Sequence, residues 1–138
     1  MPARDTYHNK AKNALLVDGW TITHDPLRLE CGNKDFYVDL GAMKLIAAEK
    51  EERKIAVEIK SFVGKSDIEE LEKALGQYVL YYDVLAELEP ERILYVAIPQ
   101  RTYRDLFEEK IGKLLLKNQR VKLIVFDENQ ESIVQWVV

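Results

Sequence analysis

The segment between residues 54 and 98 has the pattern of a strand, a long helix and a second strand, and this order constrains the fold most. Residues 54–62 alternate with the two-residue period of a β-strand. A capping box, Ser66-x-x-Glu69, then begins a helix expected to continue to about residue 88, before Glu89-Pro90. Residues 92–98 are an apolar stretch closed by Pro99. Two strands joined through a helix are typical of a right-handed parallel crossover, so the pattern predicts an α/β sheet.

The remaining elements are predicted from hydrophobic spacing and from turn residues. We expect a helix over 5–17, a strand over 20–24, a loop or short edge strand through 33, one interrupted strand over 36–40 and 45–48 with Gly41 as a bulge, a hairpin tip at 49–53, a helix over 103–116, and a C-terminal hairpin of strands 121–126 and 132–138. The apolar stripe of the long helix is expected to comprise Ile68, Leu71, Leu75, Tyr78, Val79 and Tyr82. The order α-β-β-β-α-β-α-β-β predicts a single α/β domain over residues 1–138, with a mixed β-sheet flanked by helices.

Composition limits the classes of function. The 138 residues suit one domain, and 20 basic against 24 acidic residues give a net charge of −4, which argues against non-specific coating of nucleic acid. A local basic groove on an acidic body remains open. Neither a membrane span nor a secretory signal is expected, and the single cysteine, Cys31, predicts no internal disulfide and, with only two histidines, no Cys/His zinc site. These features predict a cytoplasmic protein.

Three charged residues carry the chemistry predicted for the chain. Glu58 and Lys60 are two positions apart on one strand, so their side chains share a face about 6.5–7 Å apart. Asp39 is an aspartate within a strand, where propensity disfavours it. Two converging carboxylates can bind Mg²⁺, and an adjacent lysine can orient or deprotonate an attacking water. The alternative is that Glu-x-Lys only forms a solvated face of the sheet.

An aspartate on the second strand and Glu-x-Lys on the third resemble the PD-(D/E)XK, restriction-endonuclease-like superfamily. More specific strings resemble the XisH family, the fdxN element excision controlling factors found mainly in cyanobacteria. These strings are Arg4-Asp5-x-Tyr7-His8, Asp18-Gly19-Trp20-Thr21-Ile22-Thr23-His24-Asp25-Pro26, Asp39-Leu40-Gly41-Ala42, Ala56-Val57-Glu58-Ile59-Lys60-Ser61-Phe62 and Ala74-Leu75-Gly76-Gln77-Tyr78. The resemblance covers essentially the whole chain.

The resemblance implies a restriction-endonuclease-like core and a catalytic set of Asp39, Glu58, Lys60 and Gln77. Asp39 and Glu58 would bind Mg²⁺, with Mn²⁺ as an alternative. Many superfamily members carry a glutamate on the first helix, where this chain offers His8 as an additional metal or phosphate ligand. The implied partners are DNA, a companion factor of the XisI type and a site-specific recombinase, and a homodimer is the default for a small protein of this kind.

Two functions therefore stay open, with a purely structural α/β domain ranked last. The first is a Mg²⁺-dependent, nuclease-like protein that processes phosphodiesters during excision of a DNA element. The second is a non-catalytic accessory protein that docks XisI or the recombinase. The complete Asp/Glu/Lys set favours the first, whereas the acidic composition and the missing first-helix glutamate favour the second.

Further candidates have weaker support. Lysines 10, 12 and 65 are candidates for a phosphate groove, tyrosines 78, 81 and 82 for base stacking, and Trp136 for an exposed sheet edge. With the hairpin tip at 49–53, Asp39 lies further from the tip than Glu58 does. The two carboxylates are then expected to approach within about 6 Å only if the strand bends near Gly41.

Overall fold

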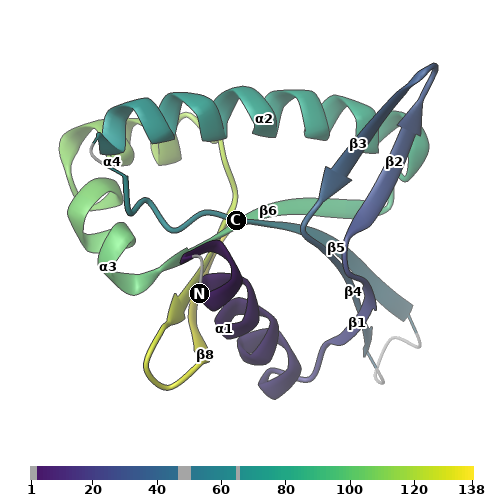
Figure 1. Ribbon diagram of the computed structural model, residues 1–138, viewed down its shortest axis with the longest axis horizontal. Helices are drawn as coiled ribbons and strands as arrows, with labels where there is room; N and C mark the ends of the chain where they lie inside the picture. The colour runs from purple at the N-terminus through teal and green to yellow at the C-terminus, as the bar shows by residue number, and fades with distance from the viewer. Residues whose placement is uncertain (1–2, 47–50, 65) are drawn as a thin grey trace.

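The computed structural model describes residues 3–46, 51–64 and 66–138, and its strands form a six-stranded sheet and a separate two-stranded ribbon (Figure 1). The elements are α1 (Ala3–Val17), β1 (Thr21–His24), β2 (Leu27–Cys31), β3 (Lys34–Val38), β4 (Leu40–Ile46), β5 (Glu51–Ile59), α2 (Asp67–Leu88), β6 (Arg92–Pro99), α3 (Gln100–Thr102), the π-helical turn η1 (Tyr103–Phe107), α4 (Lys110–Lys117), β7 (Leu123–Asp127) and β8 (Ser132–Val137). The described part of the chain contains no helix long and apolar enough to cross a membrane.

The large sheet has the strand order β1-β4-β5-β6-β7-β8 and is mixed. Strands β5, β6 and β7 are parallel to one another, whereas β1–β4, β4–β5 and β7–β8 pair antiparallel. The expected parallel crossover is confirmed, because β5 joins β6 through α2. Ser66 caps α2 as expected: its side-chain oxygen accepts a hydrogen bond from the backbone N–H of Glu69.

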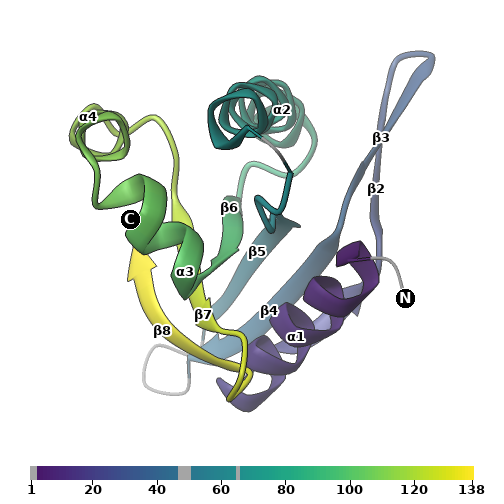
Figure 2. The ribbon, with the colours of Figure 1, turned by 60° about the vertical axis from the view of Figure 1, so that its left-hand side comes forward.

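Helices cover both faces of the sheet, as the alternation in β5 predicts. Val57 and Ile55 point to one face and pack with Ala14 and Leu15 of α1. Ala56 points to the opposite face and belongs to the hydrophobic cluster beneath α2. Figure 2 shows α1 on one side of the sheet and α2 with α4 on the other. The carboxyl end of β5 therefore lies between residues supplied by α1 and residues supplied by α2.

The predicted interrupted strand over 36–40 and 45–48 is wrong. Strand β3 leaves the large sheet and pairs with β2, and the chain breaks at Asp39 rather than at Gly41. Leu27 and Leu29 of β2, with Val38 of β3, are buried in the cluster beneath α2, and burial of this apolar surface stabilises the ribbon there. The residues expected to form a loop or short edge strand are thus β2.

The predicted hairpin tip at 49–53 is also displaced. Glu51, Glu52 and Arg53 belong to β5 and pair with β4, while residues 49 and 50 lie outside the described residues. Polar composition suggested a turn, but polar side chains are equally acceptable on a strand whose side chains face solvent.

Two helix predictions need correction. The helix expected over 103–116 is divided into η1 and α4 by a bend at residues 108–109. Gly112 of α4 packs so closely on the backbone of Leu106 and Phe107 that a Cβ would not fit there. In α2, Ile68, Val79 and Tyr82 are 46%, 61% and 53% exposed, although they were expected in the buried stripe. The buried residues of α2 are Leu71, Ala74, Tyr78, Val84 and Leu85.

Candidate functional site

Asp39 and Glu58 lie opposite each other on neighbouring strands. The pairing of Leu40 with Val57, continued by one residue, sets Asp39 across from Glu58 with both side chains on the same face. Asp39 is seven residues before Ile46, and Glu58 is seven residues after its partner Glu51. Because the two acids are equally far from the hairpin, no bend at Gly41 is required. Register irregularities lie instead between Ile22 and His24 in β1 and between Val125 and Phe126 in β7.

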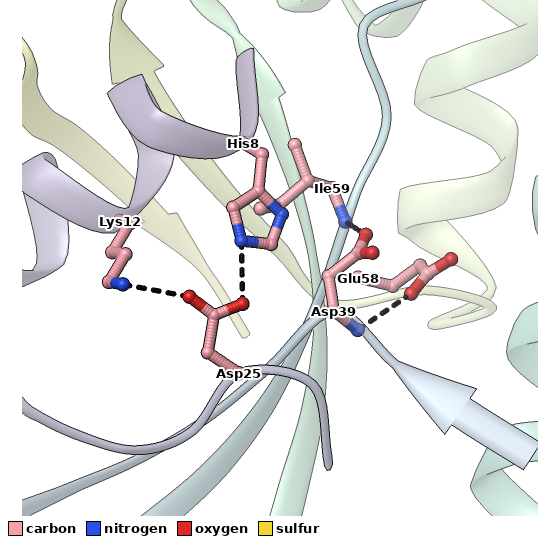
Figure 3. A network of polar contacts seen from close by, with 6 residues as sticks. All are labelled: His8, Lys12, Asp25, Asp39, Glu58 and Ile59. Atoms are coloured by element: carbon pink, nitrogen blue, oxygen red, sulfur yellow. Dashed lines mark hydrogen bonds and ion pairs between the residues drawn. The ribbon is translucent and has the colours of Figure 1, made fainter. Parts of the chain in front are cut away.

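The two carboxylates are held by reciprocal hydrogen bonds to backbone groups (Figure 3). The backbone N–H of Asp39 donates to Oε1 of Glu58 over 3.1 Å, and the backbone N–H of Ile59 donates to Oδ2 of Asp39 over 2.8 Å. Asp39 is 7% exposed and Glu58 is 9% exposed. Each side chain therefore has one oxygen fixed by the neighbouring strand, in a site largely removed from bulk water.

Burial gives this pair unusual electrostatics. Desolvation, and secondly the negative charge of Asp39, raise the pKa of Glu58 from its ordinary value of 4.5 to about 7. The ammonium group of Lys60, whose Nζ lies 3.5 Å from Oε2 of Glu58, acts in the opposite direction. A cation bound between the two carboxylates would favour their charged forms.

One pocket of about 540 Å³ at the end of β5 collects the five residues singled out in the sequence. Asp39 comes from the junction of β3 and β4, Glu58 and Lys60 from β5 and the residue after it, Gln77 from α2, and His8 from α1. Aromatic side chains of Tyr7, Tyr37, Phe62 and Tyr81 also line the pocket, together with the charged Glu70 and Lys73. These five residues are thus adjacent in space although they are spread over a stretch of 70 residues, from His8 to Gln77.

Gln77 presents a buried polar atom to this region. Its side-chain oxygen Oε1 is buried and has no hydrogen-bond partner within the described part of the chain. Buried acceptors are normally paired, because leaving one unpaired costs about 1–3 kcal/mol. Since Gln77 also lines the pocket, a bound molecule that donates a hydrogen bond would satisfy this atom.

His8 belongs to a second polar group that the sequence analysis did not identify. Its Nε2 lies 2.8 Å from Oδ1 of Asp25, and Lys12 donates to Oδ2 of the same carboxylate over 2.7 Å (Figure 3). Partial burial would raise the pKa of Asp25, but the hydrogen bonds and charges of Lys12 and His8 outweigh it and lower the pKa. The spacing of His8 and Lys12, four residues apart on one helix face, is the sequence feature that could have indicated this polar group.

The weaker candidates mostly have structural contacts. Lys10 donates to the backbone oxygen of Glu128, Lys12 binds Asp25, and residue 65 lies outside the described residues. Tyr78 is buried and donates to the backbone oxygen of Leu94, while Tyr82 lies outside the pocket that Tyr81 lines.

The expectation for Trp136 needs the same kind of correction. Strand β8 is an edge strand, but the Trp136 ring packs inward on Trp20 and Tyr95, with centroid separations of 5.7 and 5.1 Å.

The ligand atoms in the pocket determine which metal ions it could bind. Asp39 and Glu58 supply two hard carboxylate ligands, and no group of three or more His, Cys, Asp or Glu residues among those described could hold a metal. Structural zinc requires four protein ligands, whereas Mg²⁺ keeps several waters and uses one or two carboxylates plus substrate oxygens. The residues therefore fit Mg²⁺ or Mn²⁺ better than zinc.

The chain was compared with known proteins by sequence and by structure. The family model described as XisH protein matches residues 1–134. The fold is similar to the crystal structure of an XisH family protein from Nostoc punctiforme PCC 73102, with 38% identity and a TM-score of 0.88 over 97% of this chain and 100% of the other. It is also similar to the crystal structure of an fdxN element excision controlling factor protein from Anabaena variabilis, with 40% identity and a TM-score of 0.87 over 98% and 100% of the two chains. A search of curated proteins found no match. The matched residues and the shared fold show that the chain belongs to the XisH family.

Proposed function

We propose that this protein is an excision controlling factor that processes DNA phosphodiesters at the pocket formed by Asp39, Glu58, Lys60 and Gln77, on a restriction-endonuclease-like core. The observation that carries the proposal is the pair of cross-bonded, buried carboxylates next to Lys60 in one pocket. The Anabaena variabilis relative, described as an fdxN element excision controlling factor, supports the biological context. DNA is accordingly the proposed partner.

The carboxylate pair suits a reaction at a phosphate. Asp39 and Glu58 are fixed in orientation before any ligand arrives, so little side-chain entropy is lost on binding. Their shared negative charge is costly in a buried site, and a divalent cation would relieve that cost. Asp39 and Glu58 would hold Mg²⁺, or Mn²⁺ in its place, which when bound would neutralise the charge of a DNA phosphate.

Lys60 and Gln77 supply the remaining polar groups. The ammonium group of Lys60 is at the pocket and next to Glu58, where it can stabilise negative charge that develops on the phosphate oxygens. The unpaired Oε1 of Gln77 can accept a hydrogen bond from the attacking water, and its amide N–H groups can donate to phosphate oxygens. Lys60 thus stabilises charge, and Gln77 orients the groups around the reacting phosphorus.

The test uses the purified protein with Mg²⁺ or Mn²⁺ and a panel of duplex, branched and single-stranded DNAs. The wild-type protein is compared with Glu58→Ala and Lys60→Ala, and with Glu87→Ala and Lys113→Ala as exposed controls outside the pocket. We expect cleavage by the wild-type protein and both controls, and loss of cleavage in the two pocket variants. If no substrate is cut above the Glu58→Ala background, the nuclease proposal is wrong and the accessory, docking function takes its place.

A further inference from the structure

The pocket that contains Asp39 and Glu58 also contains the imidazole ring of His8. A contact with Asp25, which lies outside the pocket, fixes the orientation of this ring. His8 lines the pocket with Asp39, Glu58 and Lys60, whereas Asp25 does not line it. The bond from His8 Nε2 to Asp25 Oδ1 measures 2.8 Å, and the His8 and Asp25 side chains are 20% and 31% exposed. Figure 3 shows the second ring nitrogen, Nδ1, on the side of Ile59 and Asp39.

The hydrogen bonds around Asp25 determine which nitrogen of His8 carries the proton. Lys12 donates to Oδ2 of Asp25 over 2.7 Å, so this carboxylate is paired with a cation and accepts hydrogen bonds only. Nε2 of His8 must then be the donor to Oδ1. In the neutral ring, Nδ1 is left as a bare acceptor facing the pocket.

We propose that His8 accepts the proton of the attacking water through Nδ1, and that Asp25 is the positioning residue that sets its tautomer and orientation. This inference rests on the proposed function of the pocket. Lys60 is less suited to this task because its ammonium group is paired with Glu58 and carries no lone pair. A carboxylate behind an imidazole also stabilises the imidazolium that forms on proton transfer.

The water oxygen forms a bond to phosphorus while one water proton passes to Nδ1 of His8, and the bond from phosphorus to the leaving oxygen breaks. The leaving oxygen takes a proton from solvent, and the imidazolium later returns its proton to solvent. Asp25 stays ionised throughout, supported by Lys12.

The first test is spectroscopic and needs no cleavage. The chain has only two histidines, so the ¹⁵N spectrum of the full-length protein labelled at histidine contains two rings, and His8→Gln assigns them. We expect His8 to be neutral with its proton on Nε2, and Asp25→Asn to increase the Nδ1–H form. Asp35→Asn, an exposed aspartate paired with Arg28, is the matched control and should leave the His8 signals unchanged. A wild-type ring with its proton on Nδ1, or on both nitrogens, would overturn the proposal.

The second test is kinetic and uses the DNA that the wild-type protein cleaves best. His8→Gln should lower kcat by about 10²-fold or more with little change in KM, because the lost group acts on the water rather than on DNA binding. His24→Gln, the same substitution outside the pocket, should cleave like the wild-type protein. Asp25→Asn should lower kcat by about tenfold or more, and Asp35→Asn should not.

Two further measurements separate a chemical role from a structural one. Thermal melting checks that His8→Gln is folded, and added imidazole should restore part of the cleavage lost in His8→Ala. Equal kcat values for His8→Gln and His24→Gln, or an effect on KM alone, contradict the role of His8 while leaving the proposed function intact. Absence of cleavage by the wild-type protein contradicts the proposed function, and the proton-acceptor role is rejected with it.

Discussion

Asp39 and Glu58 each accept a hydrogen bond from the strand that carries the other acid: Glu58 from the backbone N–H of Asp39, and Asp39 from the backbone N–H of Ile59. The two side chains therefore complete the ladder between β4 and β5 at the point where β3 departs. Two like charges are held at one place by the same bonds that hold the strands together. The site consequently links the stability of the sheet to the charge on its acids.

Asp39→Asn should stabilise the protein in the absence of metal. The amide oxygen of asparagine can still accept the hydrogen bond from Ile59, while one of the two repelling charges is removed. At about pH 8 we expect a gain of about 1 kcal/mol, or roughly 3–4 °C in melting temperature. Added MgCl₂ should raise the melting temperature of the wild-type protein but not that of Asp39→Asn. Thermal melts with and without MgCl₂ check both effects, and Asp35→Asn is the control. If MgCl₂ raises the melting temperature of Asp39→Asn as much as that of the wild-type protein, Asp39 is not part of the cation site.

Glu58 should make the free energy of unfolding depend on pH. Its pKa is about 7 when folded and near 4.5 when unfolded, so the folded state binds more protons between these values. The stability contributed by protonated Glu58 is complete below about pH 4.5 and is lost as the pH rises through about 7, by about 3 kcal/mol at most. In urea denaturation the wild-type protein and Glu58→Gln should have similar stability near pH 4.5, and the wild-type protein should fall increasingly below Glu58→Gln as the pH rises through about 7. Glu87→Gln is the exposed control, and a constant difference for Glu58→Gln would contradict the raised pKa.

Gln77→Leu should raise the free energy of unfolding and lower the cleavage activity. Leucine is similar in size and removes the buried Oε1 that has no partner among the described residues, so the free energy of unfolding should rise by about 1 kcal/mol. Cleavage should fall, because the group proposed to orient water or phosphate is lost. Chemical denaturation and the cleavage assay measure the two effects. Gln130→Leu, an exposed position between β7 and β8, should change neither, and a destabilised Gln77→Leu would show that Oε1 is satisfied by solvent in the pocket.

Two glycine substitutions should have opposite effects on stability. A Cβ on Gly41 would lie 3.1 Å from Nδ1 of His24 and 3.2 Å from Nη1 of Arg92, and that arginine is buried and bonded to the backbone oxygen of Ile55. Gly41→Ala should therefore lower the free energy of unfolding by about 1–3 kcal/mol. A Cβ on Gly76 in α2 meets no atom within 4 Å, so Gly76→Ala should raise it by about 0.5–1 kcal/mol. Urea denaturation of both variants provides the comparison; stabilisation by Gly41→Ala would mean that Arg92 moves aside at little cost.

The sequence by itself determined the elements whose signals are local. Helix α2 has a capping serine at its start and Glu89-Pro90 after its end, and both are close in sequence to the residues they affect. The alternation in β5 assigned Val57 to one face of the sheet and Glu58 to the other, because a strand has a fixed two-residue period. The strings around Asp39 and Glu58 likewise identified the XisH family, which the comparisons show independently.

Tertiary structure decided what depends on contacts between distant residues. The departure of β3 toward α2 follows from burial of Leu27, Leu29 and Val38, which no local pattern distinguishes from burial against α1. The break between η1 and α4 falls at residues 108–109, within an apolar period that is otherwise helical, and at Gly112 the two segments pack backbone against backbone. The bond from His8 to Asp25 joins residues 17 positions apart and exists only because α1 and the end of β1 meet in space. Local periodicity specifies which face of a strand or helix is apolar, but the packing of those faces selects which polar side chains come together.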